Sequence, residues 1–248
     1  MCVSKNRRGS SSLFIVLLVV GIVVIIIGAV FLFLWVLPGN QRTENLDFRD
    51  FSAIEAESAV QVSVKQSDSY SVKISAGEKV FDRIEVTQEG ETLKIRVNSG
   101  LFFGTFDVKA EITMPALNSL ELSGACRGVI EGFSSSSQFI AKVSGASSLD
   151  LSNFMVEDVE FEVSGASHVK GEGTGDNLAS SVSGASNLDF TNFQVNDANV
   201  NLSGASHAIV NLTGRLDANA SGGSNLEYIG EPTLGTINTS GGSNINKK

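Results

Sequence analysis

Apolar and polar residues alternate with a period of two along most of the chain beyond residue 47. Successive side chains of a β-strand point to opposite faces, so this alternation predicts strands with one buried face. Stretches typical of turns, such as QSDS, SAGEK and QEGE, separate the alternating segments. No helical period stands out beyond Leu37, and an all-β body is therefore expected. Its first apolar positions are Val60, Val62, Val64, Tyr70, Val72, Ile74, Leu93, Ile95, Val97, Val108, Ala110, Ile112 and Met114.

A different pattern fills residues Leu13–Leu37, which contain no charged or strongly polar side chain. A helix of that length would measure roughly 37 Å, enough to cross a hydrocarbon core of about 30 Å. The segment LWVLPGN at its end lacks an A-x-A-like cleavage site, which argues against a removable signal peptide. Lys5, Arg7 and Arg8 precede the segment, and basic residues favour the cytoplasmic side. We predict a single-pass membrane helix at 13–37 with a cytoplasmic tail at 1–12 and an extracytoplasmic remainder.

One turn of small residues recurs seven times in the second half of the chain. Its copies read LSGAC, VSGAS, VSGAS, VSGAS, LSGAS, ASGGS and TSGGS, and the numbers of successive turn serines differ by 21, 20, 19, 20, 18 and 19. A period near 20 without a helix is too short for a propeller blade. It fits one coil of a parallel β-helix, which buries its inner face by stacking on the next coil. The turn serines are Ser123, Ser144, Ser164, Ser183, Ser203, Ser221 and Ser240.

Alignment of the seven coils predicts which positions face the interior. The residue before the turn serine, the residue two places further back and the fifth residue after the serine are mostly apolar. Their odd spacing places them on one face of the strands. The glycine of each turn is expected where the chain bends and the coils approach too closely for a Cβ atom. Three phenylalanines, ten residues after their turn serines, are expected to fill a second corner: Phe133, Phe154 and Phe193.

A longer period, that of two coils, is also present. The coils at Ser144 and Ser183 share the pattern SxLDxxNFxVxD, whereas those at Ser164 and Ser203 share SGASH followed by TG. The two pairs of turn serines have the same separation along the chain. A pair of coils is therefore interpreted as the ancestral unit of duplication.

A column of serines accompanies the turns. The third residue after the turn serine is a serine in six of the seven coils, and it is Cys126 in the first. Serine hydroxyl groups readily hydrogen-bond to nearby backbone. We therefore expect this column to hydrogen-bond to the tight backbone of the turns.

Two further columns face outward and hold the candidate contact residues. In the second of them, Asp150, Lys170 and Asp189 are expected to form an alternating ladder of charges on adjacent strands. The candidate residues of the two columns are Ser148, Asp150, His168, Lys170, Asn187, Asp189, His207, Asn225 and Glu227.

Neither column predicts a metal site. His168 and His207 are two coils apart, so their Cα atoms are expected to be about 9.6 Å apart. No cysteine or carboxylate joins them at a spacing suited to zinc. A lysine stands in the middle of the carboxylate column, which opposes calcium. No metal or other cofactor is expected, and the two columns are interpreted as polar surface.

Charge and cysteine content exclude several classes of protein. The net charge is −9. Without Lys5, Arg7 and Arg8, the 18 Lys and Arg become 15 against 27 Asp and Glu, a net charge of −12. Such a body repels nucleic acid and anionic lipid head groups. Cys2 and Cys126 are expected on opposite sides of the membrane, so no disulfide is predicted.

The coils also lack the features of a polysaccharide-active enzyme. Lyase chemistry needs a strong base beside a charge-neutralising ion, yet basic residues are few beyond residue 116. Tyr228 is the one tyrosine of the coils and the single tryptophan lies in the predicted membrane segment, so stacking platforms for sugars are scarce. No catalytic residue is predicted, and a glycan-active enzyme is the least favoured interpretation.

The repeated VSGAS turns, with F.AIE......V.V upstream, carry a resemblance to a known family. The chain from Phe48 to Lys248 resembles the putative auto-transporter adhesin head GIN domain family of prokaryotic cell surfaces. The resemblance implies a single-stranded, right-handed parallel β-helix and brings no catalytic residues with it. It also implies that the region at 47–115 continues or caps the solenoid. A short polar linker at 38–46 is expected before this region, and seven coils at 116–248 after it.

The sequence therefore predicts a non-catalytic β-helix, tethered to the cell membrane and facing out of the cytoplasm. We expect it to act as an adhesin-like binding or scaffold module whose partner is an envelope protein or a glycan. A regulatory partner of another membrane protein, active in envelope stress, is the alternative. Four N-x-[ST] sequons, used only in a glycosylating host, are at Asn201, Asn211, Asn219 and Asn238.

Overall fold

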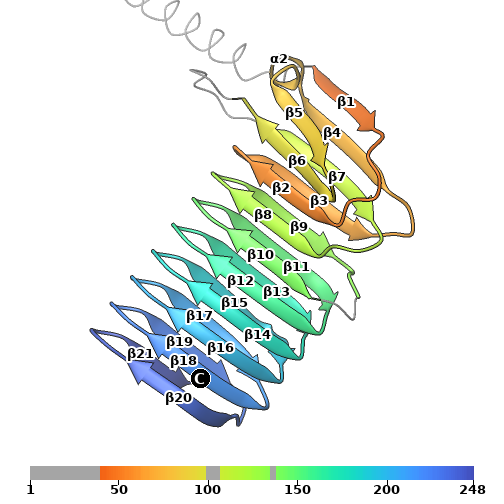
Figure 1. The fold of residues 1–248 in the computed structure, drawn as a ribbon. Coiled ribbons are helices and arrows are strands. Elements are labelled where there is room, and N and C mark those ends of the chain that lie inside the picture. Colours follow the sequence, from red (N-terminus) through yellow and green to blue (C-terminus); the bar gives the residue numbers. More distant parts are fainter. Residues whose placement is uncertain (1–39, 99–106, 135–137) are drawn as a thin grey trace, which may run out of the picture. The chain divides into compact units, whose positions relative to one another are not determined.

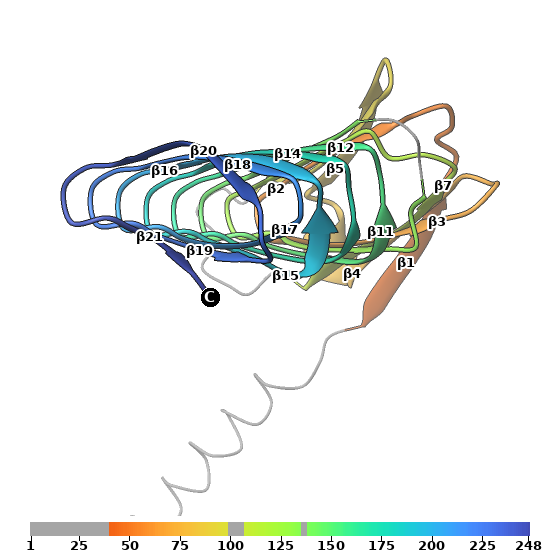
Figure 2. The same ribbon diagram turned by 90° about the horizontal axis from the view of Figure 1, so that it is seen from below.

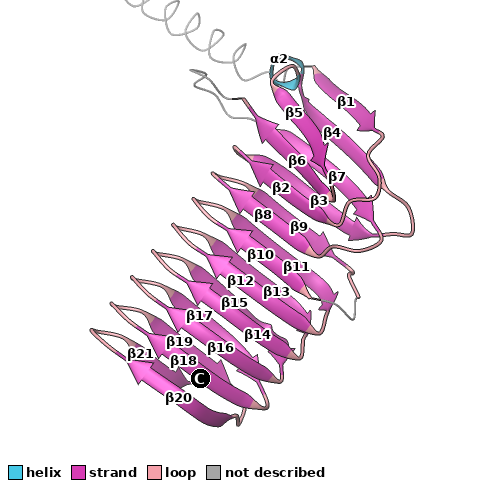
Figure 3. Ribbon diagram, viewed as in Figure 1, coloured by secondary structure: helices cyan, strands magenta, loops and turns pink. Residues whose placement is uncertain are grey.

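The computed structural model describes residues 40–98, 107–134 and 138–248. Among these residues no helix has the length and apolar character needed to cross a membrane. The predicted tail at 1–12 and membrane helix at 13–37 lie outside the described residues, and both stay predictions. Residues Gln41–Lys248 form one compact unit, which consists of strands apart from a single short helix among its described residues, α2 (Glu78–Phe81) (Figure 3).

The strands form two sheets (Figure 1). In spatial order the first sheet contains β1 (Gln41–Leu46), β4 (Ser71–Gly77), β7 (Val108–Met114), β3 (Val60–Gln66), β9 (Arg127–Glu131), β11 (Ser148–Met155), β13 (His168–Thr174), β15 (Asn187–Val195), β17 (His207–Leu212), β19 (Asn225–Ile229) and β21 (Asn244–Lys247). The second sheet contains β20 (Thr233–Thr239), β18 (Arg215–Ala220), β16 (Asp197–Leu202), β14 (Asn177–Val182), β12 (Asp158–Val163), β10 (Phe139–Val143), β8 (Ser119–Ser123), β2 (Ala53–Glu57), β6 (Thr92–Val97) and β5 (Ile84–Glu89).

Each repeat of the sequence forms one coil with a strand in each sheet. The chain runs along the second sheet, turns at the SGA-type motif and returns along the first sheet, as in β10 and β11. Every strand from β8 to β21 pairs in parallel with its counterparts in the neighbouring coils. Figure 2 shows the coils as loops that follow one another. The predicted all-β parallel solenoid is confirmed, and its handedness stays a prediction.

The N-terminal part of the unit stacks in a different order from the sequence. Strands β2 and β3 lie between β6 and β7 on one side and β8 and β9 on the other, all in parallel. Beyond β6 and β7 the pairing becomes antiparallel, through β5 on one sheet and β4 and β1 on the other. This region therefore holds coils that continue the solenoid and antiparallel strands at its end.

The predicted interior columns are buried in the coils from β8 to β19. Their members pair in register from coil to coil, for example Leu122 with Val143, Val163 and then Val182. The exceptions are Thr239, Ile237 and Ile245, which lie in the last coil and are exposed or half-buried. Strands β20 and β21 have one neighbour each among the described strands, so less apolar surface is covered there.

Phenylalanine rings form a continuous ladder through the middle of the core. All three phenylalanines predicted to fill a corner are buried. Successive ring centroids in the order Phe133, Phe154, Phe139, Phe161, Phe190 and Phe193 lie 6.2, 4.8, 6.1, 5.0 and 4.8 Å apart. Contacts at these separations and tilts are favourable beyond the area that they bury.

The two-coil period has a structural reason. Phe190 and Phe193 belong to β15, and the neighbouring strand β13 faces them with Gly171 and Gly173. A Cβ at Gly171 would lie 2.7 Å from Cε1 of Phe190. The register shifts where β13 meets β11 and β15, because β11 and β15 are the longer strands. The strands β11 and β15, which carry phenylalanine, therefore lie on either side of β13, whose glycines leave room for the rings.

The turns stack glycine upon glycine, as expected. The seven turn glycines have φ between 70° and 83°, which glycine adopts at no steric cost. A Cβ at Gly145 or at Gly165 would lie 2.4 Å from the carbonyl oxygen of the glycine in the preceding coil. That carbonyl accepts a hydrogen bond of 2.8 Å from the backbone N–H of the next turn, from Ala146 and from Ala166 respectively.

The serine column beside these glycines is buried through most of the stack. The hydroxyl groups of Ser206 and Ser224 each donate a hydrogen bond of 2.9 Å to the carbonyl of their own turn serine, three residues earlier. The backbone N–H of Ser167 donates to the hydroxyl oxygen of Ser186 in the next coil, at 3.3 Å. The expectation that this column binds the tight backbone is confirmed.

Candidate functional site

The two outward columns predicted from the sequence exist on the first sheet. Strand register aligns Arg127, Ser148, His168, Asn187, His207, Asn225 and Asn244, and beside them Val129, Asp150, Lys170, Asp189, Ile209, Glu227 and Asn246. Most of these side chains are exposed or half-buried, and Ile209 is buried. The structure thus brings all nine candidate residues together on one face. Their role as contact residues stays a prediction.

The charges on this face pair differently from the expected ladder. Asp150 lies beside Lys170 in register, yet its carboxylate forms an ion pair of 3.0 Å with Arg127 in the preceding coil. Lys170 forms its ion pair with Glu172 on its own strand, at 3.4 Å. Residues two apart on one strand point to the same side of the sheet. Each cation can therefore pair with a carboxylate on its own strand or with one on a neighbouring strand. These exposed pairs contribute little stability.

Asp189 is held by neighbours other than lysine. Partial burial raises the pKa of its carboxyl group, but hydrogen bonds from the backbone N–H and hydroxyl of Thr191 outweigh that effect and lower it overall. The charges of Lys248 and Lys170 act in the same direction as these hydrogen bonds. Asp189 is therefore a charged side chain fixed in one orientation on the surface.

The two histidines do not converge on a common ion. Asn187 lies between His168 and His207 in register. Nδ1 of His207 instead lies 3.2 Å from the side-chain amide of Asn225 in the following coil. Among the described residues no group of three or more His, Cys, Asp or Glu side chains is arranged to hold a metal.

A further polar column, which the sequence reasoning missed, runs along the second sheet. It consists of the residues two places before the turn serines, which register aligns from coil to coil: Glu121, Lys142, Glu162, Ser181, Asn201, Asn219 and Asn238. Three of the four sequons fall in this column. That coincidence is a signal in the sequence that the side chains form one surface feature.

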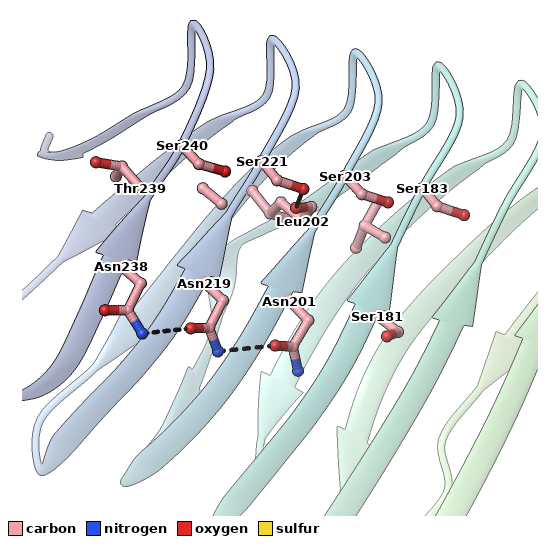
Figure 4. Close-up of a pocket in the computed structure, with 12 residues that line it drawn as sticks. Ser181, Ser183, Asn201, Leu202, Ser203, Asn219, Ser221, Asn238, Thr239 and Ser240 are labelled. Carbon is pink, nitrogen blue, oxygen red and sulfur yellow. Dashed lines mark hydrogen bonds between the residues drawn. The ribbon is translucent and has the colours of Figure 1, made fainter.

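The asparagines of this column form a hydrogen-bonded ladder (Figure 4). The amide of Asn238 donates to Oδ1 of Asn219 at 2.8 Å, and that of Asn219 donates to Oδ1 of Asn201 at 3.0 Å. The amide of Asn201 donates to Oδ1 of Asn199 at 3.3 Å. The direction of donation is the same from coil to coil, which aligns the amide dipoles along the stack.

The ladder forms one wall of a shallow groove of about 390 Å³. The other wall is the column of turn serines, and the residue between the two columns completes the lining in each coil (Figure 4). We call this feature the asparagine groove. Its polar lining residues are Ser181, Ser183, Asn201, Ser203, Asn219, Ser221, Asn238, Thr239 and Ser240.

The asparagine groove is uncharged although the protein is acidic. No residue that lines it carries a charge, whereas the same column contains an ion pair of 3.0 Å between Lys142 and Glu162 in the two preceding coils. A neighbouring concavity on the second sheet contains charge: Arg215 holds Asp217 through hydrogen bonds of 2.6 and 2.9 Å. These bonds are the main reason why the pKa of Asp217 is lowered to about 2.

Cys126 occupies the position of the buried serine in the first SGA-type turn. Its thiol is free, buried, and donates to the carbonyl of Ser123 at 3.2 Å. Burial raises the pKa of the thiol. Since the thiolate is the reactive form, this cysteine serves packing rather than chemistry.

Comparisons with known proteins agree with the resemblance seen in the sequence. Residues 50–232 match the family model described as "Putative auto-transporter adhesin, head GIN domain". A comparison with curated proteins finds no match.

Solved structures share the fold at low sequence identity. A putative adhesin from Bacteroides fragilis is 22% identical, with a TM-score of 0.81, and the match covers 85% of this chain and 99% of that one. A putative lipid binding protein from Parabacteroides distasonis is 20% identical, with a TM-score of 0.65 and coverage of 85% and 97%. A putative adhesin from the same organism is 16% identical, with a TM-score of 0.64 and coverage of 85% and 98%. At these identities the likeness is one of fold.

Proposed function

Because the chain belongs to the family described as "Putative auto-transporter adhesin, head GIN domain", we propose that it is an adhesin-like binding module at the cell envelope. The predicted helix at 13–37 would tether it to the membrane, with residues from Pro38 onward facing out of the cytoplasm. The matched family and two of the three relatives above are described as adhesins. These descriptions favour a role in binding over one in catalysis.

The observation that carries this proposal is the asparagine groove. It is a concavity that four successive coils build from repeated side chains. Three of the four strands beneath it, β14, β16 and β18, are paired on both sides, and β20 is paired on one. Most of the groove is therefore rigid. A rigid site loses little conformational entropy when a partner binds. We therefore assign the main contact surface to the second sheet, and keep the nine residues of the first sheet as a separate candidate surface.

Attachment of cells that display the full chain tests this assignment. A triple variant with Asn201→Ala, Asn219→Ala and Asn238→Ala should lose attachment and the capture of envelope components, because the ladder is removed. The matched control carries Asn187→Ala, Asn225→Ala and Asn244→Ala in the amide column of the first sheet. Loss confined to the control would place the contact surface on the first sheet. Unchanged attachment and capture by both variants would contradict a binding role.

A further inference from the structure

The hydrogen-bonding capacity of the asparagine groove is only partly used within the protein. A carboxamide has two N–H donors and an oxygen with two lone pairs. Asn219 uses one N–H towards Asn201 and one lone pair towards Asn238, and it is exposed. The hydroxyl groups of Ser203 and Ser240 on the opposite wall are also exposed. The groove therefore offers donors and acceptors together, in successive coils.

This mixture suits a ligand whose groups both donate and accept hydrogen bonds. Hydroxyl groups do both, whereas carboxylates and phosphates only accept and are best bound by arginine or lysine. No basic residue lines the groove, and the net charge of the protein is −9. A cationic ligand would find no carboxylate in the groove either. The lining thus favours an uncharged ligand over an ionic one.

Two other classes of ligand fit the groove poorly. Acyl chains need apolar walls, but the side chains of Val182, Leu202 and Ala220 beneath the groove point into the core and are at most 3% exposed. An extended peptide binds sheets by pairing with a free strand edge. Strands β14, β16 and β18 are paired on both sides, and the free edge is that of β20 in the last coil. A peptide paired there would leave the other three coils of the groove uncontacted.

The spacing of the coils indicates how a ligand would lie in the groove. Parallel strands lie about 4.8 Å apart, so one asparagine and one serine recur at that interval along the stack. We propose that the asparagine groove binds an uncharged, polyhydroxylated polymer, that is a neutral glycan, which lies along the solenoid axis and contacts one rung per coil. This inference rests on the proposed function and specifies the ligand class of the same site.

Binding of this kind has two measurable properties. Each rung adds weak contacts to a partner that is already held, so affinity should rise with the length of the glycan until the four coils are spanned. Hydrogen bonds between uncharged groups are not screened by ions, so affinity should be insensitive to salt.

The experiment measures binding of the full chain in detergent micelles to three kinds of probe. These are neutral oligosaccharides of graded length built from glucose, galactose or mannose, the acidic polymer polygalacturonate, and vesicles of phosphatidylcholine and phosphatidylglycerol. We expect neutral oligosaccharides to bind, the longer ones more tightly, with the same affinity at low and high salt. Asn219→Asp should weaken this binding about tenfold or more, since a carboxylate cannot donate to a hydroxyl oxygen or to Oδ1 of Asn201.

Two further variants keep the result interpretable. Asn192→Asp makes the same change at an exposed asparagine of β15 that belongs to neither candidate surface, and it should leave binding unaltered. Ser203→Arg places a long side chain over the groove from an exposed turn position, so it should weaken binding even if Asn219→Asp lowers stability. Thermal unfolding of each variant shows whether the fold is retained.

The outcomes separate this inference from the proposed function. Salt-dependent binding of polygalacturonate, binding of vesicles that Ser203→Arg abolishes, or failure of every neutral oligosaccharide would overturn the neutral glycan. If the cells in the attachment test still lose an envelope protein when the groove is altered, the binding module survives with a protein as its partner. Neutral glycan binding that Asn219→Asp and Ser203→Arg leave intact would place the sugar elsewhere and overturn the inference as well.

Discussion

At the scale of single residues, the turns depend on glycine, because it has no Cβ atom. Each SGA-type turn after the first contains a glycine with positive φ whose Cα faces the carbonyl oxygen of the glycine one coil earlier. The small residues of the motif therefore serve the approach of the backbones, and the buried serine beside them satisfies a backbone carbonyl. Neither residue is free to bind a ligand. Any contact with a partner falls to the turn serine at the start of the motif and to the residues on either side of the turn.

Gly165→Ala should therefore destabilise the protein strongly. Its φ is 79°, and the new Cβ would lie 2.4 Å from the carbonyl oxygen of Gly145. Backbone strain and separation of the stacked turns together should cost about 2–4 kcal/mol. Chemical denaturation of the full chain in detergent measures the loss.

Gly223→Ala is the matched control. A Cβ there would have its nearest neighbour at 4.0 Å, and other turns carry alanine at the same position, as at Ala166. This substitution should be neutral or stabilise by about 0.4–1 kcal/mol. Equal losses for Gly165→Ala and Gly223→Ala would contradict the role assigned to the stacked glycines.

The pair of Arg215 and Asp217 should make stability depend on pH in a defined window. Hydrogen bonds from Arg215 and from the backbone N–H of Thr236 lower the pKa of Asp217 from 3.8 to about 2. A lowered folded pKa contributes stability above the unfolded value, and that contribution is lost as pH falls through about 2. The Tm of the wild type should exceed that of Asp217→Asn by a constant amount above about pH 5, and the gap should close towards pH 2. A gap of the same size at pH 2 would contradict this assignment.

At the scale of elements, adjacent strands differ in bulk so that their coils can fit together. The long strand β15 brings Phe190 and Phe193, and the slim strand β13 brings Gly171 and Gly173. A β-solenoid made of identical coils would have to repeat the same bulk at every level. The alternation allows large aromatic side chains to fill a core whose strands lie only about 4.8 Å apart.

A double-mutant cycle tests this fit. Gly171→Ala should destabilise by about 1–3 kcal/mol because its Cβ would lie 2.7 Å from the ring of Phe190. Phe190→Leu removes part of that ring, so the two changes combined should cost less than their sum by at least about 0.5 kcal/mol. Additive losses of unfolding free energy in chemical denaturation would show that the clash between the new Cβ and the ring of Phe190 is relieved by other parts of the structure.

The interior and the outward columns of the first sheet could be predicted because alternation and the turn spacing determine them. Leu149 and Val169 had to be buried once the strands were aligned, and Asp150 and Lys170 had to face out. The register shifts between β11, β13 and β15 could not be predicted. They depend on how the rings of the phenylalanines meet neighbouring backbones, which periodicity does not encode.

The asparagine groove was missed for a different reason. Sequence reasoning sought outward columns after the turn serine and only interior columns before it, whereas Asn201, Asn219 and Asn238 come before it. Their column is charged in the earlier coils, at Glu121 and Lys142, so it lacks a uniform repeat. The sequons are the signal that was overlooked, and the register shows that the amide residues continue the line of the charged ones.

At the scale of the whole molecule, a pair of coils is the unit that can be added or removed. Excision of the segment 164–202 takes out two coils and places β17, a shorter strand without phenylalanine, beside the long strand β11, as β13 was before. The shortened chain should fold cooperatively, with a smaller denaturant m value in proportion to its smaller buried surface.

Excision of the segment 164–182 removes one coil and is the informative contrast. It places β15 beside β11, so Phe154 would meet Phe190 and Phe193 without the intervening glycines. This variant should have a lower denaturation midpoint than the one that lacks two coils, although it retains more of the chain. A midpoint equal to or above that of the longer excision would contradict the pairing of coils.

The threading of β2 and β3 through the N-terminal part has a consequence for the order of assembly. These strands come early in the chain, yet they lie inside the stack, with β6 and β7 on one side and β8 and β9 on the other. If folding starts at β2 and β3, strands can be added on either side of them, which gives the stack two growth fronts. One front folds back and ends at the antiparallel strands β1, β4 and β5, whereas the other adds coils in the order in which they are synthesised. The second front requires only contacts between successive coils, which are local in the chain and form fast.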